Sequence, residues 1–104
     1  MDKIKWTEKA ISNLQAIHDY ISRDSKTYAT RFIKSLIHAT LKLEKMPRCG
    51  RIIPELKEYG FREVIFQNYR IVYRVVESSN DIEILVVIHC ARNFETAFSQ
   101  EWEL

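Results

Sequence analysis

The sequence predicts an α+β domain in which a two-helix hairpin packs on one face of an antiparallel sheet. Apolar residues recur at helical spacing in the first half of the chain and with a period of two in the second half. Both prolines lie between the halves, in residues 47–60. A chain of 104 residues with 46% apolar residues can bury one core. We therefore expect residues 1–104 to form a single domain of order β-α-α-β-β-β.

The first helix is expected to follow a short strand at residues 4–6. Thr7 stands where a helix N-cap is needed, because its hydroxyl can accept a free amide of the first turn. The apolar residues that follow at helical spacing are Ala10, Leu14, Ile17 and Ile21. The alternation of residues 4–6 favours a strand added at an edge of the sheet.

A second helix is expected from Ser25 to about Lys45. Ser25 can cap its first turn, and the helix must stop before Pro47, which has no amide hydrogen to donate. The short break between the helices predicts that they run antiparallel. The pattern therefore gives a hairpin with one continuous apolar side.

Three strands are predicted at residues 61–66, 69–76 and 82–90, all rich in β-branched and aromatic residues. Gln67-Asn68 is expected to form a two-residue turn and residues 78–81 a four-residue turn. The strands then form an antiparallel meander.

These turns set a register that divides the sheet into two faces. Val64 is expected opposite Ile71, and Arg70 opposite His89. The face toward the helices then carries Val64, Phe66, Tyr69, Ile71, Tyr73, Val75, Ile84, Val86 and Ile88. The face left open carries Glu63, Arg70, Arg74, Glu83 and His89 among Ile65, Val72, Leu85 and Val87. A slip of one residue would exchange the two faces.

The candidate functional residues are six arginines and one histidine of the second half of the chain: Arg48, Arg51, Arg62, Arg70, Arg74, His89 and Arg92. Guanidinium groups bind phosphate and carboxylate with two hydrogen bonds, and an imidazole can transfer a proton near neutral pH. An alternative role is structural, because Glu63 can pair with Arg70 or Arg74 across the strands. His18 and His38 are expected at the surface or core edge, Cys90 in the core and Cys49 in a loop.

Composition excludes several classes of protein. Two glycines provide no phosphate-binding loop, and two cysteines provide neither a disulfide framework nor a zinc motif. We expect no metal and no cofactor. No apolar run is long enough to span a bilayer, and the N-terminus does not read as a secretion signal. The expected location is cytoplasmic, without membrane association.

Charge is unevenly distributed along the chain. The net formal charge is +4 over residues 1–46, +3 over 47–76 and −5 over 77–104. A basic body favours an anionic partner, such as nucleic acid or an acidic protein segment, although a solvated surface explains the same numbers. Residues 94–104 have apolar residues at helical spacing and are expected to form either a docked terminal helix or a partner-binding tail.

Six motifs stand in chain order between residues 6 and about 94. They are Trp6-Thr7-x-x-Ala10, Leu14-x-x-Ile17-x-x-Tyr20-Ile21, Pro47-x-x-Gly50-Arg51-x-x-Pro54-Glu55, Arg62-Glu63-Val64-Ile65, Asn68-Tyr69-Arg70-Ile71-Val72-Tyr73-Arg74 and His89-x-x-Arg92. This ordered set resembles the RelE/ParE toxin superfamily. The resemblance implies a growth-inhibiting toxin of a type II toxin–antitoxin system, neutralised by a cognate antitoxin and oligomerising through that complex.

The superfamily has two activities, and the motifs resemble the ParE branch more. ParE-like toxins inhibit DNA gyrase without catalysis; the residues implied to bind the target are Arg51, Arg62, Arg70, Arg74, His89 and Arg92. The alternative is a RelE-like endoribonuclease that cuts mRNA on the translating ribosome, with Arg70, His89 and Arg92 as its catalytic residues. The strand that carries paired lysines in RelE-like enzymes reads Phe61-Arg62-Glu63 here, and their tail tyrosine falls near Ala97-Phe98. A third interpretation, outside the toxins, is a plain RNA- or protein-binding module.

Overall fold

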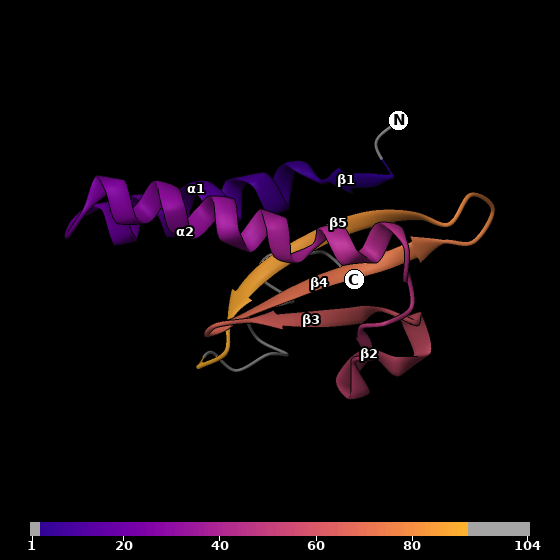
Figure 1. The fold of residues 1–104 in the computed structure, drawn as a ribbon. Coiled ribbons are helices and arrows are strands. Elements are labelled where there is room, and N and C mark those ends of the chain that lie inside the picture. Colours follow the sequence, from indigo (N-terminus) through magenta and orange to yellow (C-terminus); the bar gives the residue numbers. More distant parts are fainter. Residues whose placement is uncertain (1–2, 92–104) are drawn as a thin grey trace.

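The computed structural model describes residues 3–91, which form two helices packed against one face of a five-stranded sheet (Figure 1). The elements in chain order are β1 (Ile4–Trp6), α1 (Glu8–Ser22), α2 (Lys26–Ala39), the 3₁₀ helix η1 (Leu41–Glu44), β2 (Arg51–Ile52), the 3₁₀ helix η2 (Pro54–Tyr59), β3 (Arg62–Phe66), β4 (Tyr69–Val76) and β5 (Asp81–His89). The strand order is β1-β5-β4-β3-β2, with β1 parallel to β5 and the other pairs antiparallel. The predicted α+β class and the edge position of the first strand are confirmed.

Both helices begin at the predicted caps. The Thr7 hydroxyl accepts the amide of Ala10 at 3.1 Å, and the Ser25 hydroxyl accepts the amide of Tyr28 at 3.1 Å. The Thr7 hydroxyl also donates to the carbonyl of Leu85 at 3.0 Å, so the start of α1 is fixed to β5. The capping residue therefore positions the helix over the sheet as well as starting it.

Helix α2 ends at Ala39, six residues before the predicted end near Lys45. The buried Thr40 donates its hydroxyl to the carbonyl of Ile37 at 2.7 Å, and its amide donates to the same carbonyl at 3.0 Å. These bonds to a residue three positions back tighten the chain into η1. The apolar spacing continues through η1, so it did not indicate where the α-helix ends.

The β3–β4 register is as predicted, with Val64 opposite Ile71 and Ile65 opposite Arg70. The β4–β5 register is not. The loop between β4 and β5 ends at Asn80, which has a positive φ of 60°. The Asn80 amide donates to the Val76 carbonyl at 2.7 Å and so closes the loop. A bulge then inserts Leu85 between the pairs Val72–Val86 and Tyr73–Ile84.

The shifted register changes the face of several β5 residues. Arg70 lies opposite Ile88 instead of His89, and Ile71 lies opposite Val87. Val87 packs in the core under the helices, whereas Val86 and Ile88, predicted there, pack on the other face. The predicted face assignments of these three residues were therefore wrong, because the one-residue bulge has no signal in the alternation of residue types.

The sheet carries a core on each face. The buried residues of the core under the helices are Ala10, Ile17, Leu36, Leu43, Val64, Ile71, Tyr73, Ile82, Ile84 and Val87. The second core comprises Ile53, Leu56, Val72, Leu85, Val86 and Ile88, with Phe61 packed against it. Residues 47–61, here called the strap, thus cover part of the face that the sequence predicted to be open. Within residues 3–91, no helix combines the length and the apolar character needed to cross a membrane.

Candidate functional site

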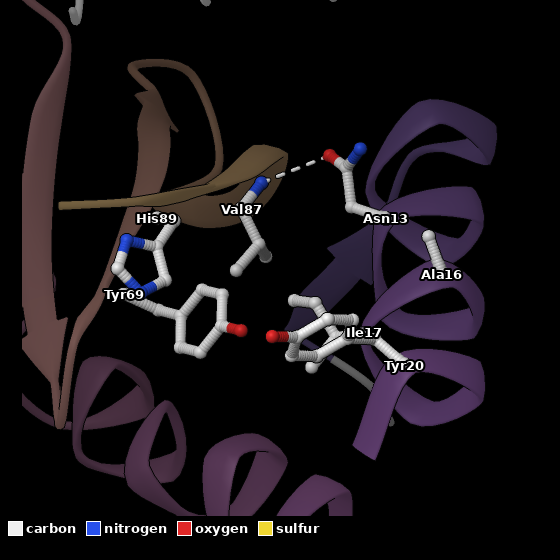
Figure 2. Close-up of a pocket in the computed structure, with 7 residues that line it drawn as sticks. All are labelled: Asn13, Ala16, Ile17, Tyr20, Tyr69, Val87 and His89. Atoms are coloured by element: carbon white, nitrogen blue, oxygen red, sulfur yellow. Dashed lines mark hydrogen bonds between the residues drawn. The ribbon is translucent and has the colours of Figure 1, made fainter. Parts of the chain in front are cut away.

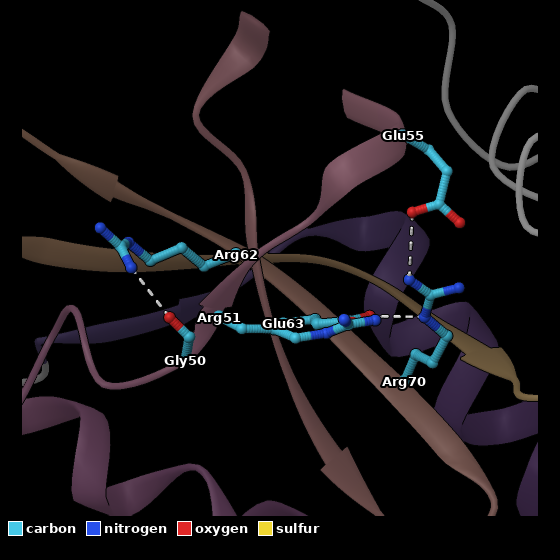
Figure 3. Close-up of polar contacts among 6 residues, drawn as sticks. All are labelled: Gly50, Arg51, Glu55, Arg62, Glu63 and Arg70. Atoms are coloured by element: carbon cyan, nitrogen blue, oxygen red, sulfur yellow. Dashed lines mark hydrogen bonds and ion pairs between the residues drawn. The ribbon is translucent and has the colours of Figure 1, made fainter. Parts of the chain in front are cut away.

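The predicted arginine face contains an ion-pair network centred on Glu63 (Figure 3). The Glu63 side chain is fully buried, and its two oxygens accept Nε–H of Arg51 and Nε–H of Arg70, each at 2.5 Å. Arg70 also forms an ion pair with Glu55 at 3.7 Å. A buried carboxylate is tolerated only when it is paired and hydrogen-bonded, and Glu63 meets both conditions.

The network joins three segments. Arg51 and Glu55 come from the strap, Glu63 from β3 and Arg70 from β4. Arg70 is only 12% exposed, whereas Arg51 is 63% exposed. Two guanidinium and two carboxylate groups give a formal charge of zero. Arg70 is therefore committed to internal pairing, and Arg51 alone of the pair offers much surface to a partner.

Tyr73 of β4 and Arg62 of β3 attach the start of the strap to the sheet through hydrogen bonds. The Tyr73 hydroxyl donates to the carbonyl of Pro47 at 2.8 Å and accepts the amide of Gly50 at 3.0 Å. Arg62 donates to the carbonyls of Gly50 at 2.9 Å and Arg48 at 3.2 Å. Burial raises the pKa of the Tyr73 hydroxyl above its ordinary value. Pro47 and Gly50 of the motif Pro47-x-x-Gly50-Arg51 are thus both hydrogen-bonded to side chains of the sheet.

Gly50 is required by close approach. A Cβ at this position would lie 2.5 Å from Oη of Tyr73 and 2.7 Å from the carbonyl oxygen of Glu63. Only glycine allows the strap to pass this close to β3 and β4.

Arg74 and Arg48 also have partners within the chain. Arg74, 49% exposed, donates Nε–H to Glu83 at 2.6 Å, as its place opposite Glu83 in the β4–β5 register requires. Arg48 donates to the side-chain oxygen of Asn80 at 3.2 Å. Exposed pairs of this kind contribute little to stability and remain accessible to a competing partner.

His89 lies on the opposite face from Arg70, so the predicted grouping of His89 with Arg70 and Arg74 was wrong. The cause is the β4–β5 register, which places His89 opposite Tyr69 at the end of β5. The rings of Tyr69 and His89 pack edge to face with centroids 5.0 Å apart. His89 Nδ1 accepts the amide of Ala91 at 3.0 Å, which leaves Nε2 to carry the proton of the neutral ring.

His89 lines a pocket of about 380 Å³ between α1 and the sheet (Figure 2). Its lining residues are Asn13, Ala16, Ile17, Tyr20, Tyr69, Val87 and His89. The Asn13 side-chain oxygen accepts the amide of Val87 at 3.0 Å. Burial, and then the neighbouring Tyr20, raise the pKa of Tyr69. Aromatic rings with a few polar groups can bind a side chain or a base. Among residues 3–91, no arginine lines this pocket beside the imidazole.

The remaining site expectations divide as follows. Arg51, Arg70 and Glu63 are brought together, while Arg92 and the tail at 94–104 lie outside the described residues. Cys90 is exposed, so its predicted place in the core was wrong; Cys49 is exposed in a loop as predicted. His18 and His38 lie on the helix surface as predicted.

Glu55 and the pocket residues on α1 were missed by the sequence reasoning. Their only signals were the strap motif, which contains Glu55, and the helical spacing that placed Asn13 and Tyr20 beside core positions. In residues 3–91, no three His, Cys, Asp or Glu side chains are grouped so that they could hold a metal ion.

The architecture is shared with a solved structure. A solved structure from a chromosomal ParDE TA system of P. aeruginosa has a similar fold, with a TM-score of 0.68 over 86% of this chain and 96% of that chain. The two chains are 23% identical, so this likeness concerns the fold. The described part of the molecule is therefore a small α+β domain with the same fold as that solved chain.

The family follows from sequence comparison. The family model described as ParE toxin of type II toxin-antitoxin system, parDE, matches residues 4–94. A protein of Sinorhizobium fredii (strain NBRC 101917 / NGR234), named "Putative toxin Y4kP", is 33% identical over 89 residues, covering 84% of this chain and 86% of that protein. The chain belongs to the ParE family of toxins of type II toxin–antitoxin systems, and the resemblance seen in its motifs is confirmed.

Proposed function

We propose that this toxin arrests growth by binding DNA gyrase, without catalysing a reaction itself. The observation that carries the proposal is the separation of Arg70 and His89 on opposite faces of the sheet. Membership of the ParE family supports the same choice between the two superfamily activities.

An endoribonuclease needs a base, an acid and cations within reach of one phosphate. Arg70 is paired with two carboxylates, and His89 faces α1 in an aromatic pocket. This arrangement supports a binding protein over a catalyst.

We propose Arg51 and Arg74 as the principal target contacts, because both are exposed while holding a single carboxylate each. Arg62, His89 and Arg92 remain proposed contacts of lesser weight, and Arg70 positions Glu63 for Arg51. The antitoxin of the pair is the proposed inhibitor, forming an oligomeric complex with the toxin in the cytoplasm.

The test is a supercoiling assay with purified gyrase and the full-length toxin, run beside a translation extract in which mRNA ends are mapped. We expect toxin to block supercoiling and leave mRNA intact. Arg74→Gln should weaken inhibition at least several-fold, whereas Lys57→Gln, a matched loss of one exposed charge on η2, should not. Uninhibited gyrase together with new mRNA ends at the ribosomal A site would overturn the proposal in favour of RNA cleavage.

A further inference from the structure

The outer face of α2 carries a row of cationic and hydroxyl side chains. Thr27, Arg31, Lys34 and His38 are all exposed and recur at intervals of three or four residues, so they lie along one side of the helix. The opposite side holds the buried Ala29 and Leu36. No carboxylate occurs anywhere in α2, Lys26–Ala39.

Two hollows lie along this row and share Arg31 and Lys34. The first, of about 420 Å³, is completed by Thr27 and Thr30. The second, of about 510 Å³, is completed by Ser35, His38, Ala39 and Phe66. Cations in a concave setting lined by hydroxyl groups are suited to an anionic ligand.

Within residues 3–91, neither Arg31 nor Lys34 forms an ion pair with a carboxylate. Arg51, Arg70 and Arg74 of the sheet each form at least one. The arrangement also works against the helix itself. The like charges of Arg31 and Lys34, three residues apart, destabilise the helix, and Lys26 in its first turn opposes the helix dipole. A solvated face would gain stability from mixed signs.

We propose that this α2 face binds the phosphodiester backbone of a nucleic acid. Arg, Lys, Ser and Thr side chains are the usual donors to phosphate oxygens, and all four types occur here. From Arg31 to His38 the row extends about 10 Å along the helix. A nucleic-acid strand carries a charge every ~3.4 Å of its axis, so the row reaches more than one phosphate.

An acidic peptide is the competing ligand, and the surface fits it less well. Protein interfaces are anchored by aromatic or apolar side chains that become fully buried. Among the residues that the structure describes, Phe66 is the one large apolar side chain that lines either hollow. The inference does not depend on gyrase as the target, because it concerns the toxin and nucleic acid alone.

The test is fluorescence anisotropy of labelled 20-bp DNA and RNA duplexes titrated with the full-length toxin at several salt concentrations. We expect salt-dependent binding that Arg31→Gln with Lys34→Gln weakens about tenfold or more. The slope of log affinity against log salt should fall by about 1.8, since each lost phosphate contact removes ~0.9. Preference for one duplex identifies whether the backbone is that of DNA or of RNA.

The matched control is Lys5→Gln with Lys57→Gln, which removes two exposed charges from β1 and η2. It should retain binding to within about twofold. Equal losses in both double variants would assign binding to overall charge and overturn the proposal. Absence of binding by the unmodified toxin, or equal affinity for poly-glutamate of matched charge, would overturn it as well. Circular dichroism of each variant confirms that the fold is retained.

Discussion

Glu63 shows how one buried charge determines the chemistry of its neighbours. Its carboxylate is fully enclosed and accepts from both Arg51 and Arg70, while Glu55 balances the second guanidinium. In a low-dielectric setting, removing one partner costs more than the complete network contributes. Arg51 and Arg70, predicted from the sequence to bind a target, therefore also neutralise the buried Glu63 in the fold.

Glu63→Gln keeps the size of the side chain and removes its charge. We expect the free energy of unfolding to fall by about 3–5 kcal/mol, because Arg70 is left buried without its main counter-charge. Urea denaturation at neutral pH measures the change. Glu83→Gln, which breaks the exposed pair with Arg74, should cost at most about 1 kcal/mol. Equal costs in the two variants would contradict the role given to the network.

The buried hydroxyl of Tyr73 is the basis of a second prediction, which concerns the free energy of unfolding. Tyr73→Phe leaves the Gly50 amide and the Pro47 carbonyl without their partner, so we expect a loss of about 1–3 kcal/mol at pH 8.

The same variant has a defined pH dependence. The pKa of Tyr73 is raised in the folded state, so above its ordinary value of 10.0 the unfolded chain binds fewer protons than the folded one. The stability contributed by the protonated hydroxyl is complete below pH 10 and declines as pH rises toward the folded pKa. Unfolding curves at pH 8 and pH 10.5 should show the gap between the toxin and Tyr73→Phe narrowing. A constant gap would contradict the burial of this hydroxyl.

At the scale of elements, α1 is fixed to the sheet by its N-cap residue, Thr7. The Thr7 hydroxyl caps α1 through the Ala10 amide and also donates to the Leu85 carbonyl of β5. Within residues 3–91, the Ser25 hydroxyl has a hydrogen bond to the Tyr28 amide alone. The two caps thus differ in their tertiary bond and are alike in their local one.

Thr7→Val preserves the shape of the side chain and removes both bonds. We expect it to destabilise the fold by about 2 kcal/mol, against about 1 kcal/mol for Ser25→Ala, because a cap and a further hydrogen bond each contribute about 1 kcal/mol. Thermal unfolding followed by circular dichroism compares them. Equal losses would show that the bond to Leu85 adds nothing.

The elements also show what sequence can and cannot predict. Residue types at single positions predicted the caps at Thr7 and Ser25 and the turn at Gln67-Asn68, and all three predictions are confirmed. The bulge at Leu85 could not be predicted from the sequence. Both faces of the sheet carry an apolar core, so the apolar residues of β5 fit on either face. The place of His89 depends on that bulge, so this part of the site could not be predicted.

At the scale of the molecule, the described positive charges divide into a set paired with carboxylates and a set on α2 outside those pairs. Within residues 3–91, the sheet arginines are paired with carboxylates of the strap and strands, while Arg31 and Lys34 on the outer face of α2 are not. The sequence predicted a basic body and a target-binding surface on the open face of the sheet. Pairing could not be read from composition, because it depends on the strap folding back over β3.

The strap also makes the sheet a two-sided structure, with cores that share β4 and β5. Ile53 in the second core and Leu36 in the first are both fully buried. We expect Ile53→Ala and Leu36→Ala each to lower the free energy of unfolding by about 2–5 kcal/mol, the range for truncating a buried aliphatic side chain. Because Val72 and Ile71 are adjacent on β4 and face opposite cores, loss of either core should unfold the other. Urea transitions followed by far-UV and near-UV circular dichroism should therefore coincide in both variants. An early near-UV transition confined to Ile53→Ala would mean that the strap opens on its own, leaving Glu63 and Arg70 exposed while the helices stay packed.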